Sequence, residues 1–241
     1  MNGKPELKID WATWRAAMYA CKNWHYSGAI PTPPYNIVGV WEDDVFCGVV
    51  IFSRGASKDL GTRYGLITTE VCELSRVALR SHKTEVSKIV SIAIKMLRAQ
   101  SPGIRLIVSF ADTNHGHIGA IYQAGGWIYT GETSSSTEYL TKSGKVLHSR
   151  QVGLSGLKKQ YGVIRQVPKQ TDCIKIKRLP KHRYLMPLDS EMRKQIEPLR
   201  KQYPKKCVKS IDGDAIVTPD NRGQFDSDLN AQCSIGLIHA T

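Results

Sequence analysis

The 241-residue sequence has no run of about 18 or more apolar residues, the length that a membrane-spanning helix needs. It also has no C-x-x-C pair, and its six scattered cysteines fit neither a zinc ribbon nor a dense disulfide scaffold. The opening residues Met1–Glu6 lack the apolar stretch that follows the lysine in an export signal. We therefore expect a cytosolic protein without membrane contact, whose cysteines are reduced and mostly buried.

Acidic residues are scarce in one stretch of the chain. The formal net charge of +13 divides into +2 for residues 1–140, +14 for 141–206 and −3 for 207–241. In the middle stretch the basic residues are interleaved with Tyr161, Tyr184 and Tyr203. A solvated surface would explain some of this charge, but so large a surplus favours binding to a polyphosphate. We expect a core over 1–140, a basic, nucleic-acid-binding extension over 141–206 and an acidic, mobile tail over 207–241.

Hydrophobic periodicity predicts an α/β core. The expected elements are a helix at 11–24 capped by Asp10, strands at 35–41, 45–52 and 70–79, a helix at 85–99, a strand at 104–110, a short helix at 116–124 and a strand at 127–130. Beyond these, the pattern predicts a hairpin at 141–148, a strand pair at 173–188 and a basic helix at 190–202. The central alternation of strands and helices requires crossover connections, and therefore a mixed sheet covered by helices.

Two stretches carry a resemblance to known families. Ile107–Asn114 reads as a buried strand ending in a polar turn, and Ala120–Trp127 places Tyr122 before two glycines and an aromatic residue. This order is similar to the second half of the Gcn5-type N-acetyltransferase (GNAT) fold. The first 140 residues also resemble the Mom family of Mu-like phages, on the segments Leu7–Trp14, Ala20–Tyr26, Val49–Ala56, Ser109–Asn114 and Ile121–Gly125. The expected fold is thus α/β, a GNAT-like mixed central sheet flanked by helices, with a basic C-terminal extension.

The Mom-like resemblance implies a phage enzyme that converts adenine N6 in double-stranded DNA to the carbamoylmethyl form and so protects the DNA from host restriction. Such an enzyme acts in the cytoplasm of the infected bacterial host. The exocyclic amine is a poor nucleophile, so it needs an activated donor held close, and the base must first leave the helical stack. Acetyl-CoA and glycyl-tRNA are both donors that would serve, and the basic stretch suits tRNA as well as DNA. A non-catalytic DNA-binding protein, or an acetyltransferase acting on a protein or small-molecule amine, are the alternatives.

Polar residues at the ends of the expected strands are the candidates for catalysis. Glu73 is a candidate base or amine-orienting group, and Arg76 a candidate partner for a phosphate or carbonyl; a strand-end ion pair is the alternative. Regular alternation would place these two on opposite faces, unless a strand bulge intervenes. Asp112 follows a buried strand, where it would accept the amine proton, although Asp112 or Asn114 would equally cap the next helix.

The other candidates come mainly from the family resemblances. Tyr122 matches the acetyltransferase tyrosine that protonates the leaving group, although helical tyrosines are often only packed. His25 and Tyr26 lie in the Mom-like match, as an active-site wall or as ligands if a metal such as iron is used. His115 and His117 would also bind a metal, but no third ligand stands at an obvious spacing.

Glycine is absent from residues 80–85, where GNAT enzymes hold the pyrophosphate of CoA on a glycine-rich loop. Arg80, Lys83 and Ser109 are the candidate donor contacts, but close backbone approach is harder without glycine. Thr32–Tyr35 resembles the Asp/Asn-Pro-Pro-Tyr/Phe motif of adenine methyltransferases, with a threonine at the first position; a plain proline turn is the alternative. The candidate DNA contacts are Tyr35, Lys158, Lys159, Arg165, Lys177, Arg178 and Arg183.

Overall fold

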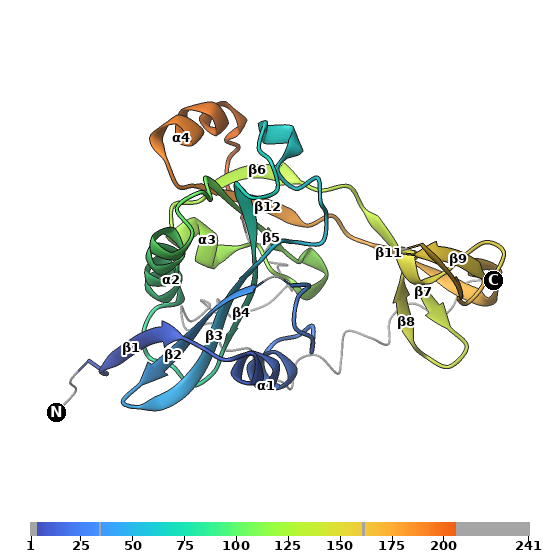
Figure 1. The fold of residues 1–241 in the computed structure, drawn as a ribbon, viewed down its shortest axis with the longest axis horizontal. Coiled ribbons are helices and arrows are strands. Elements are labelled where there is room, and N and C mark those ends of the chain that lie inside the picture. Colours follow the sequence, from blue (N-terminus) through green and yellow to red (C-terminus); the bar gives the residue numbers. More distant parts are fainter. Residues whose placement is uncertain (1–3, 34, 161, 206–241) are drawn as a thin grey trace, which may run out of the picture.

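The computed structural model describes residues 4–33, 35–160 and 162–205. Tyr161 and the acidic tail expected over 207–241 lie outside the described residues. Within them, the chain forms a large mixed sheet with helices on both faces, and a smaller module of short strands beside it (Figure 1). None of the described helices combines the length and the apolar character of a membrane span.

Seven strands make the large sheet, in the order β1-β2-β3-β4-β5-β12-β6. They are β1 (Leu7–Trp11), β2 (Tyr35–Glu42), β3 (Val45–Ser53), β4 (Val71–Leu79), β5 (Leu106–Ala111), β6 (Ile128–Glu132) and β12 (His182–Pro187). Of these neighbours only β4 and β5 run parallel, because helix α2 (Val86–Gln100) connects them across one face of the sheet. The strand order and this single crossover establish the mixed, GNAT-like sheet that we expected.

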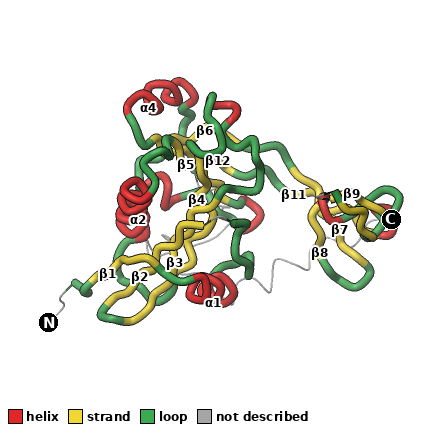
Figure 2. The backbone as a smooth tube through the Cα atoms, viewed as in Figure 1, coloured by secondary structure: helices red, strands yellow, loops and turns green. Residues whose placement is uncertain are grey.

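Helices cover the sheet from both sides (Figure 2). Helix α2 packs its apolar stripe, Ile89 to Leu97, against one face, and the short helix α3 (Ala120–Ala124) lies on the same side. Helix α1 (Trp14–Trp24) covers β2, β3 and β4 on the other face, and α4 (Ser190–Ile196) covers β5, β12 and β6 there. Each half of the second face therefore has its own helix.

Two irregularities in β4 place the functional groups. The β3–β4 ladder pairs Ile51 with Arg76 and Phe52 with Leu74, so Ser75 is an extra residue in a β-bulge. The β4–β5 ladder is only three pairs long and ends at Glu73 opposite Val108. Beyond this point β4 follows β3 and β5 follows β12 (Figure 1). The two strands therefore part and leave a wedge between their C-terminal halves.

The basic stretch is an insertion in the sheet, whereas we expected an extension beginning at residue 141. Residues 133–181, between β6 and β12, contain eleven lysines and arginines against two acidic residues. They form a sheet of β8 (Val146–His148), β7 (Ser136–Thr141) and β11 (Cys173–Arg178), and a hairpin of β9 (Leu157–Gln160) and β10 (Val163–Gln166). The chain then returns through β12, where Tyr184 and Leu185 are fully buried. We call residues 133–181 the inserted module.

Several expected elements have different boundaries or partners. Strand β1 was not predicted; it includes Trp11, which we assigned to the first helix, and Asp10, its expected cap. The helix starts instead at Trp14, with Thr13 as its cap. The pair expected at 173–188 does not form, because β11 joins β7 in the module while β12 joins β5 and β6. The expected hairpin at 141–148 is confirmed as β7–β8.

The tyrosines and cysteines of the described chain are mainly packing residues. Tyr184 is buried in the core, and Tyr203 packs against it with its hydroxyl donating to the Trp127 carbonyl, so neither belongs to a basic surface. The four described cysteines form no disulfide, and Cys21, Cys47 and Cys72 are buried, as expected for reduced cysteines.

Candidate functional site

The wedge between β4 and β5 is closed at its base by hydroxyl groups. The Ser109 hydroxyl oxygen lies 2.8 Å from the Leu74 carbonyl and 2.7 Å from the Tyr122 hydroxyl. A serine has one hydroxyl hydrogen and a carbonyl only accepts, so when Ser109 donates to Leu74, Tyr122 donates to Ser109. Burial raises the pKa of Tyr122 to about 12, so its proton stays in place. Both side chains brace the point where the strands part, and neither faces open solvent.

The bulge at Ser75 brings Glu73 and Arg76 to the same face of the sheet, the one that α1 covers, because their partners Ser53 and Ile51 are two residues apart. Arg76 donates through Nε to the Ala29 carbonyl at 3.1 Å and through Nη1 to the Ser75 carbonyl at 2.6 Å. The guanidinium therefore ties the loop after α1 to β4. Glu73 and Arg76 do not form an ion pair in the described part of the chain. The alternative that we considered for them, a strand-end ion pair, is therefore not formed.

Glu73 is the carboxylate at the wedge whose environment favours the protonated form. Burial raises the pKa of Glu73, against the opposing effects of the Arg76 charge and of hydrogen bonds from Ala56 and Ser75. Its carboxylate packs on Gly55, where an added Cβ would stand 2.9 Å from Oε2; Gly55 also has a φ of +83°. The glycine thus gives the carboxylate its space. A carboxylate with a raised pKa is a stronger base when ionised, which suits proton transfer near neutral pH.

Four rings form a row beside these groups. Tyr26 stacks on His25 and lies against His115, with ring centroids 4.3 Å apart in each case, and it also contacts His117 at 5.4 Å. His25 and Tyr26 follow α1, whereas the other histidines belong to the turn after β5, so the row joins two sides of the wedge. The Tyr26 side chain is half exposed.

The imidazole of His25 is neutral. Its Nδ1 accepts from the Ser27 backbone amide at 3.1 Å, which leaves the ring hydrogen on Nε2. Burial and the charges of Arg76, His117 and His115 lower the pKa of His25 to about 3. The ring therefore acts as an apolar wall with one N–H donor, and it carries no charge at neutral pH.

Asp112 is held by partners on both oxygens. Its Oδ1 accepts from the backbone and side-chain amides of Asn114 at 3.0 and 2.8 Å, and its Oδ2 pairs with Lys181 Nζ at 3.0 Å. Burial alone would raise the pKa of Asp112, but the hydrogen bonds from Asn114 and Lys181 and the lysine charge lower it. This is the helix-cap arrangement that we considered for Asp112 and Asn114, and it makes Asp112 a weaker base than Glu73.

Lys181 is a site residue that the sequence did not single out. It stands at the end of the inserted module and reaches back to Asp112, while Asn114 Oδ1 accepts from the Leu179 backbone amide at 3.0 Å. In the sequence, Lys181 is one of eighteen basic residues between 141 and 206, and no spacing distinguishes it. Only the return of β12 to the sheet brings it to the wedge.

The loop between β4 and α2 does not fit the pyrophosphate of CoA. The backbone amides of Lys83 and Thr84, which would face such an anion, donate to the two carboxylate oxygens of Glu42, each at 2.7 Å. Glu42 is only 6% exposed, and although burial would raise its pKa, these hydrogen bonds lower it. Arg80 and Lys83 have exposed side chains here, but the amides are already occupied. Ser109, the third candidate donor contact, is buried at the base of the wedge.

The candidate DNA contacts divide into exposed and internally bound residues. Lys159, Arg165 and Lys177 are exposed on the inserted module. In contrast, Lys158 Nζ donates to the carbonyls of Ser149 and Val152, and Arg178 pairs with Glu138 at 2.6 Å. The last two lie outside the module: Arg183 is half-buried in β12, and Tyr35 packs with the residues under α1.

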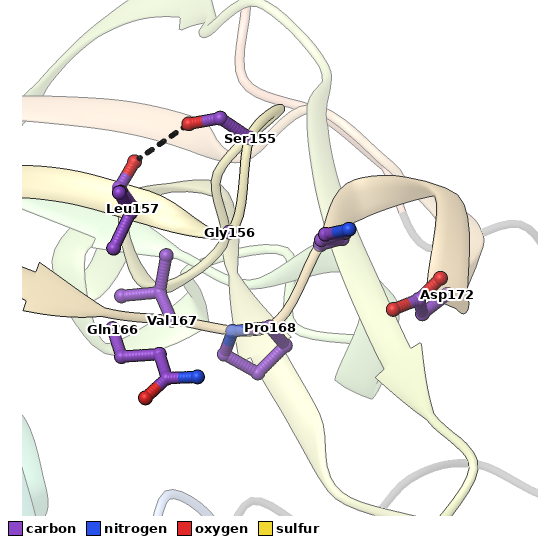
Figure 3. Close-up of a pocket in the computed structure, with 8 residues that line it drawn as sticks. Ser155, Gly156, Leu157, Gln166, Val167, Pro168 and Asp172 are labelled. Atoms are coloured by element: carbon purple, nitrogen blue, oxygen red, sulfur yellow. Dashed lines mark hydrogen bonds between the residues drawn. The ribbon is translucent and has the colours of Figure 1, made fainter.

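The inserted module also has an open pocket of its own, of about 730 Å³, beside the β9–β10 hairpin (Figure 3). Gln166, Lys169 and Asp172 are its polar side chains, and the rest of its lining is glycine, serine and apolar residues. None of the residues of the wedge lines this pocket. Its two charged side chains resemble no catalytic set, so we place the candidate site at the wedge.

No group of three or more His, Cys, Asp or Glu side chains in the described part of the chain is arranged to hold a metal ion. The centroids of the His115 and His117 rings are 6.3 Å apart, and the Tyr26 ring contacts both. His25 lies on the other side of Tyr26 from His115. The donor set expected for iron is therefore not formed by these histidines.

The sequence model of the Mom protein family matches residues 6–205, across the sheet, the wedge and the inserted module. The chain belongs to the Mom family. A curated member of similar sequence is the methylcarbamoylase mom of Escherichia phage Mu, 24% identical over 200 residues, which cover 80% of each chain. The match includes the stretch beyond residue 140, where the resemblance in the sequence is weaker.

Solved structures similar to this family member include acetyltransferases. One is from Bacillus subtilis in complex with CoA (11% identity, 77% of this chain and 100% of that one, TM-score 0.39). Another is a putative acetyltransferase from Salmonella typhimurium with its cofactor acetyl-CoA (16% identity, 76% and 95%, TM-score 0.41). The fold class itself follows from the strand order of the sheet.

Proposed function

We propose that this chain modifies double-stranded DNA, converting adenine N6 to the carbamoylmethyl form and thereby protecting phage DNA from restriction in the host cytoplasm. The observation that carries the proposal is Glu73, a largely enclosed carboxylate of raised pKa at the point where β4 and β5 part. It lies beside the half-exposed Tyr26 ring, to whose pKa it contributes. The phage Mu relative, a methylcarbamoylase, supports the class of reaction.

Glu73 supplies the base that the reaction needs. When the amine nitrogen attacks the carbonyl carbon of an acyl donor, a C–N bond forms and the leaving group departs with the electrons of its former bond. The nitrogen must then lose a proton, which we assign to the Glu73 carboxylate. Arg76, fixed by the Ala29 and Ser75 carbonyls, directs positive charge to the same face of the sheet and would stabilise the developing oxyanion.

The other site residues position these groups. Asp112 and Asn114 hold the turn after β5 against Lys181 and Leu179 of the inserted module. The row of His25, Tyr26 and His115 gives flat surfaces next to the wedge, which suit an extruded base. Ser109, with Tyr122 behind it, joins the two strands at the base of the wedge through its hydrogen bond to the Leu74 carbonyl.

The donor is an activated acyl or aminoacyl group. An acetyl group has no nitrogen, so acetyl-CoA alone does not supply the amide of the carbamoylmethyl group. Acetyl-CoA would also require a pyrophosphate contact other than the Lys83 and Thr84 amides, because Glu42 occupies both. A glycyl donor such as glycyl-tRNA has one chemical advantage: a glycyl group and a carbamoylmethyl group on N6 are isomers. Transfer followed by migration to the carbon-linked amide would therefore give the proposed product without any further reactant.

The test is nucleoside mass spectrometry of plasmid DNA from cells that express the wild-type chain, Glu73→Gln or Glu70→Gln. We expect a carbamoylmethyl adduct of deoxyadenosine in the wild type and in the Glu70→Gln control, and none in Glu73→Gln. Because the glycyl isomer has the same mass, retention time against a synthetic standard distinguishes the two. A folded wild-type chain that binds DNA but leaves no adduct would support the alternative, a non-catalytic DNA-binding protein.

A further inference from the structure

The outward face of α1 is aromatic where a surface helix is normally polar. Its inward residues Ala17, Ala20 and Cys21 are fully buried against the sheet, as an amphipathic helix requires. On the opposite side, Trp14 and Tyr19 are 52% and 55% exposed, with the partly exposed Met18 beside them. Large aromatic side chains gathered on a surface commonly mark a binding site.

The same face is positively charged. Arg15 and Lys22 are exposed, and α1 contains no acidic residue. Neither basic side chain is in an ion pair with any described residue. Docking α1 on a second copy of itself would bring these like charges together, which opposes self-association. A polyanion with flat apolar faces, which is what a nucleic acid presents, matches both the charges and the rings.

The face leads directly to the wedge. Helix α1 ends at Trp24, and the next two residues, His25 and Tyr26, belong to the row of rings beside Glu73 and Arg76. Eleven residues of helix extend about 16 Å, at roughly 1.5 Å per residue. This length spans about five base-pair steps of duplex DNA. A target base held beside the row of rings would thus place its flanking nucleotides along the helix.

We propose that the α1 face, formed by Trp14, Arg15, Tyr19 and Lys22, binds the DNA that flanks the target adenine. Arg15 and Lys22 contact backbone phosphates, and Trp14 and Tyr19 pack on exposed bases or sugars. This assignment rests on the proposed function of the wedge and adds to it a second DNA contact, apart from the inserted module.

The test compares charge reversal on α1 with the same reversal on the opposite face of the sheet. Arg15→Glu with Lys22→Glu is the test variant, and Lys88→Glu with Lys95→Glu, exposed on α2, is the matched control. With a short duplex in fluorescence anisotropy, we expect at least a tenfold rise in Kd for the α1 variant. The slope of log Kd against log salt should fall by about 2, since each lost phosphate contact removes about 0.9. The control should stay within about twofold of wild type.

A second variant tests the aromatic part of the face. Trp14→Ala with Tyr19→Ala should weaken binding while it leaves the salt slope unchanged, because no phosphate contact is removed. Thermal melting of the charge-reversal variants should match wild type, because these basic side chains are exposed. Trp14→Ala with Tyr19→Ala should melt slightly lower, because the Tyr19 ring packs edge-on against Trp24 with centroids 5.2 Å apart. Light scattering then checks the competing explanation: a change in oligomeric mass without a change in DNA affinity would make the face a self-association surface and overturn the proposal.

The outcomes separate this proposal from the function of the wedge. If the Arg15→Glu, Lys22→Glu variant binds and modifies DNA like wild type, the α1 assignment is wrong and the proposed reaction stands. If wild type leaves no adduct but the α1 variant loses DNA binding, the surface stands and the proposed reaction fails.

Discussion

The loops that follow β4 and β5 stand at the same end of the only parallel strand pair in the large sheet, yet they are built in opposite ways. In the loop after β4, the Lys83 and Thr84 amides are engaged by the buried carboxylate of Glu42. The loop after β5 places His115 and His117 against the half-exposed Tyr26 ring. Beside this ring, burial raises the pKa of Glu73, because its hydrogen bonds and nearby positive charges do not offset the loss of solvent.

This difference shows how one fold can move its binding site. An anion site at a helix N-terminus is removed once the protein supplies its own carboxylate, because the amides gain a permanent partner. A buried carboxylate without an ion-pair partner has the reverse character, since burial disfavours its charge until a ligand arrives. The first arrangement stabilises the fold, and the second keeps chemical reactivity. Substitutions in the two loops should therefore have opposite consequences.

The largest effect should come from Glu73→Gln. We expect modification activity to fall by about 100-fold or more, the usual contribution of a general base. Stability should change the other way: a pKa raised by folding disfavours the ionised carboxylate in the native state, so wild type loses stability as pH rises through that pKa and the variant does not. Adduct formation at several pH values measures the first effect, and urea denaturation at pH 5 and 8 measures the second.

Two results would contradict this assignment. A Glu73→Gln chain that still forms adduct at the wild-type rate has its base elsewhere. If activity fell only at pH values below the ordinary pKa of a glutamate, the catalytic group would not have the raised pKa of Glu73. Asp112→Asn is the matched comparison: its carboxylate has a lowered pKa, so it should lose stability at neutral pH, where Glu73→Gln gains it.

Glu42→Ala should give the largest loss of stability in the closed loop. Two backbone amides lose a charged acceptor, and each such hydrogen bond is worth about 1.5–3 kcal/mol, so we expect a loss of roughly 3 kcal/mol in urea denaturation at pH 7. Because folding lowers the Glu42 pKa, the difference from wild type should shrink as pH falls below 4. Any binding of CoA to wild type in calorimetric titration should not depend on the Lys83–Thr84 loop; binding that does depend on this loop would mean that the Glu42 carboxylate is displaced.

In the inserted module, the exposed basic residues should affect DNA binding, whereas the internally bound Lys158 should affect stability. Lys159→Ala, Arg165→Ala and Lys177→Ala should each weaken DNA binding and lower the salt slope by up to about 0.9. Lys158→Ala should instead lower the melting temperature, because its ammonium group bridges the Ser149 and Val152 carbonyls. Anisotropy and thermal melting on the same four variants check both statements. Equal salt slopes for Lys158→Ala and Lys159→Ala would contradict the division.

Much of the large sheet could be predicted from the sequence, because its strands and α2 have strong periodic patterns. The stripe from Ile89 to Leu97 identified the long helix, and the apolar runs of β3 and β5 identified buried strands. The position of β12 was not predictable in this way. Its burial depends on pairing with strands fifty or more residues earlier in the chain. The charge count over 141–206 treated β12 as part of a basic surface, so it gave no sign of this pairing.

The fold brings most of the proposed catalytic residues together, and their roles stay predictions. His25, Tyr26, Glu73, Arg76, Asp112, Asn114, Ser109 and Tyr122 all lie around the wedge. Local sequence could not show that Lys181 and Asn114 saturate Asp112, nor that Glu42 covers the Lys83 amide, because each contact joins distant segments. The bulge at Ser75 likewise depends on register with β3, and it alone decides that Glu73 and Arg76 share a face.

The last effect concerns His25, on the open side of the comparison. Folding lowers the pKa of His25 to about 3, whereas the unfolded chain binds a proton below about 6.5. Wild type should therefore lose stability as pH falls from 7 to 4, by up to about 1.4 kcal/mol per pH unit for this one proton. His25→Gln lacks that proton, so its free energy of unfolding should depend less on pH over the same range. Urea denaturation at pH 4, 5, 6 and 7 measures both slopes. Equal slopes would mean that solvent protonates His25 in the folded chain, and the row of rings would then be open to water on that side as well.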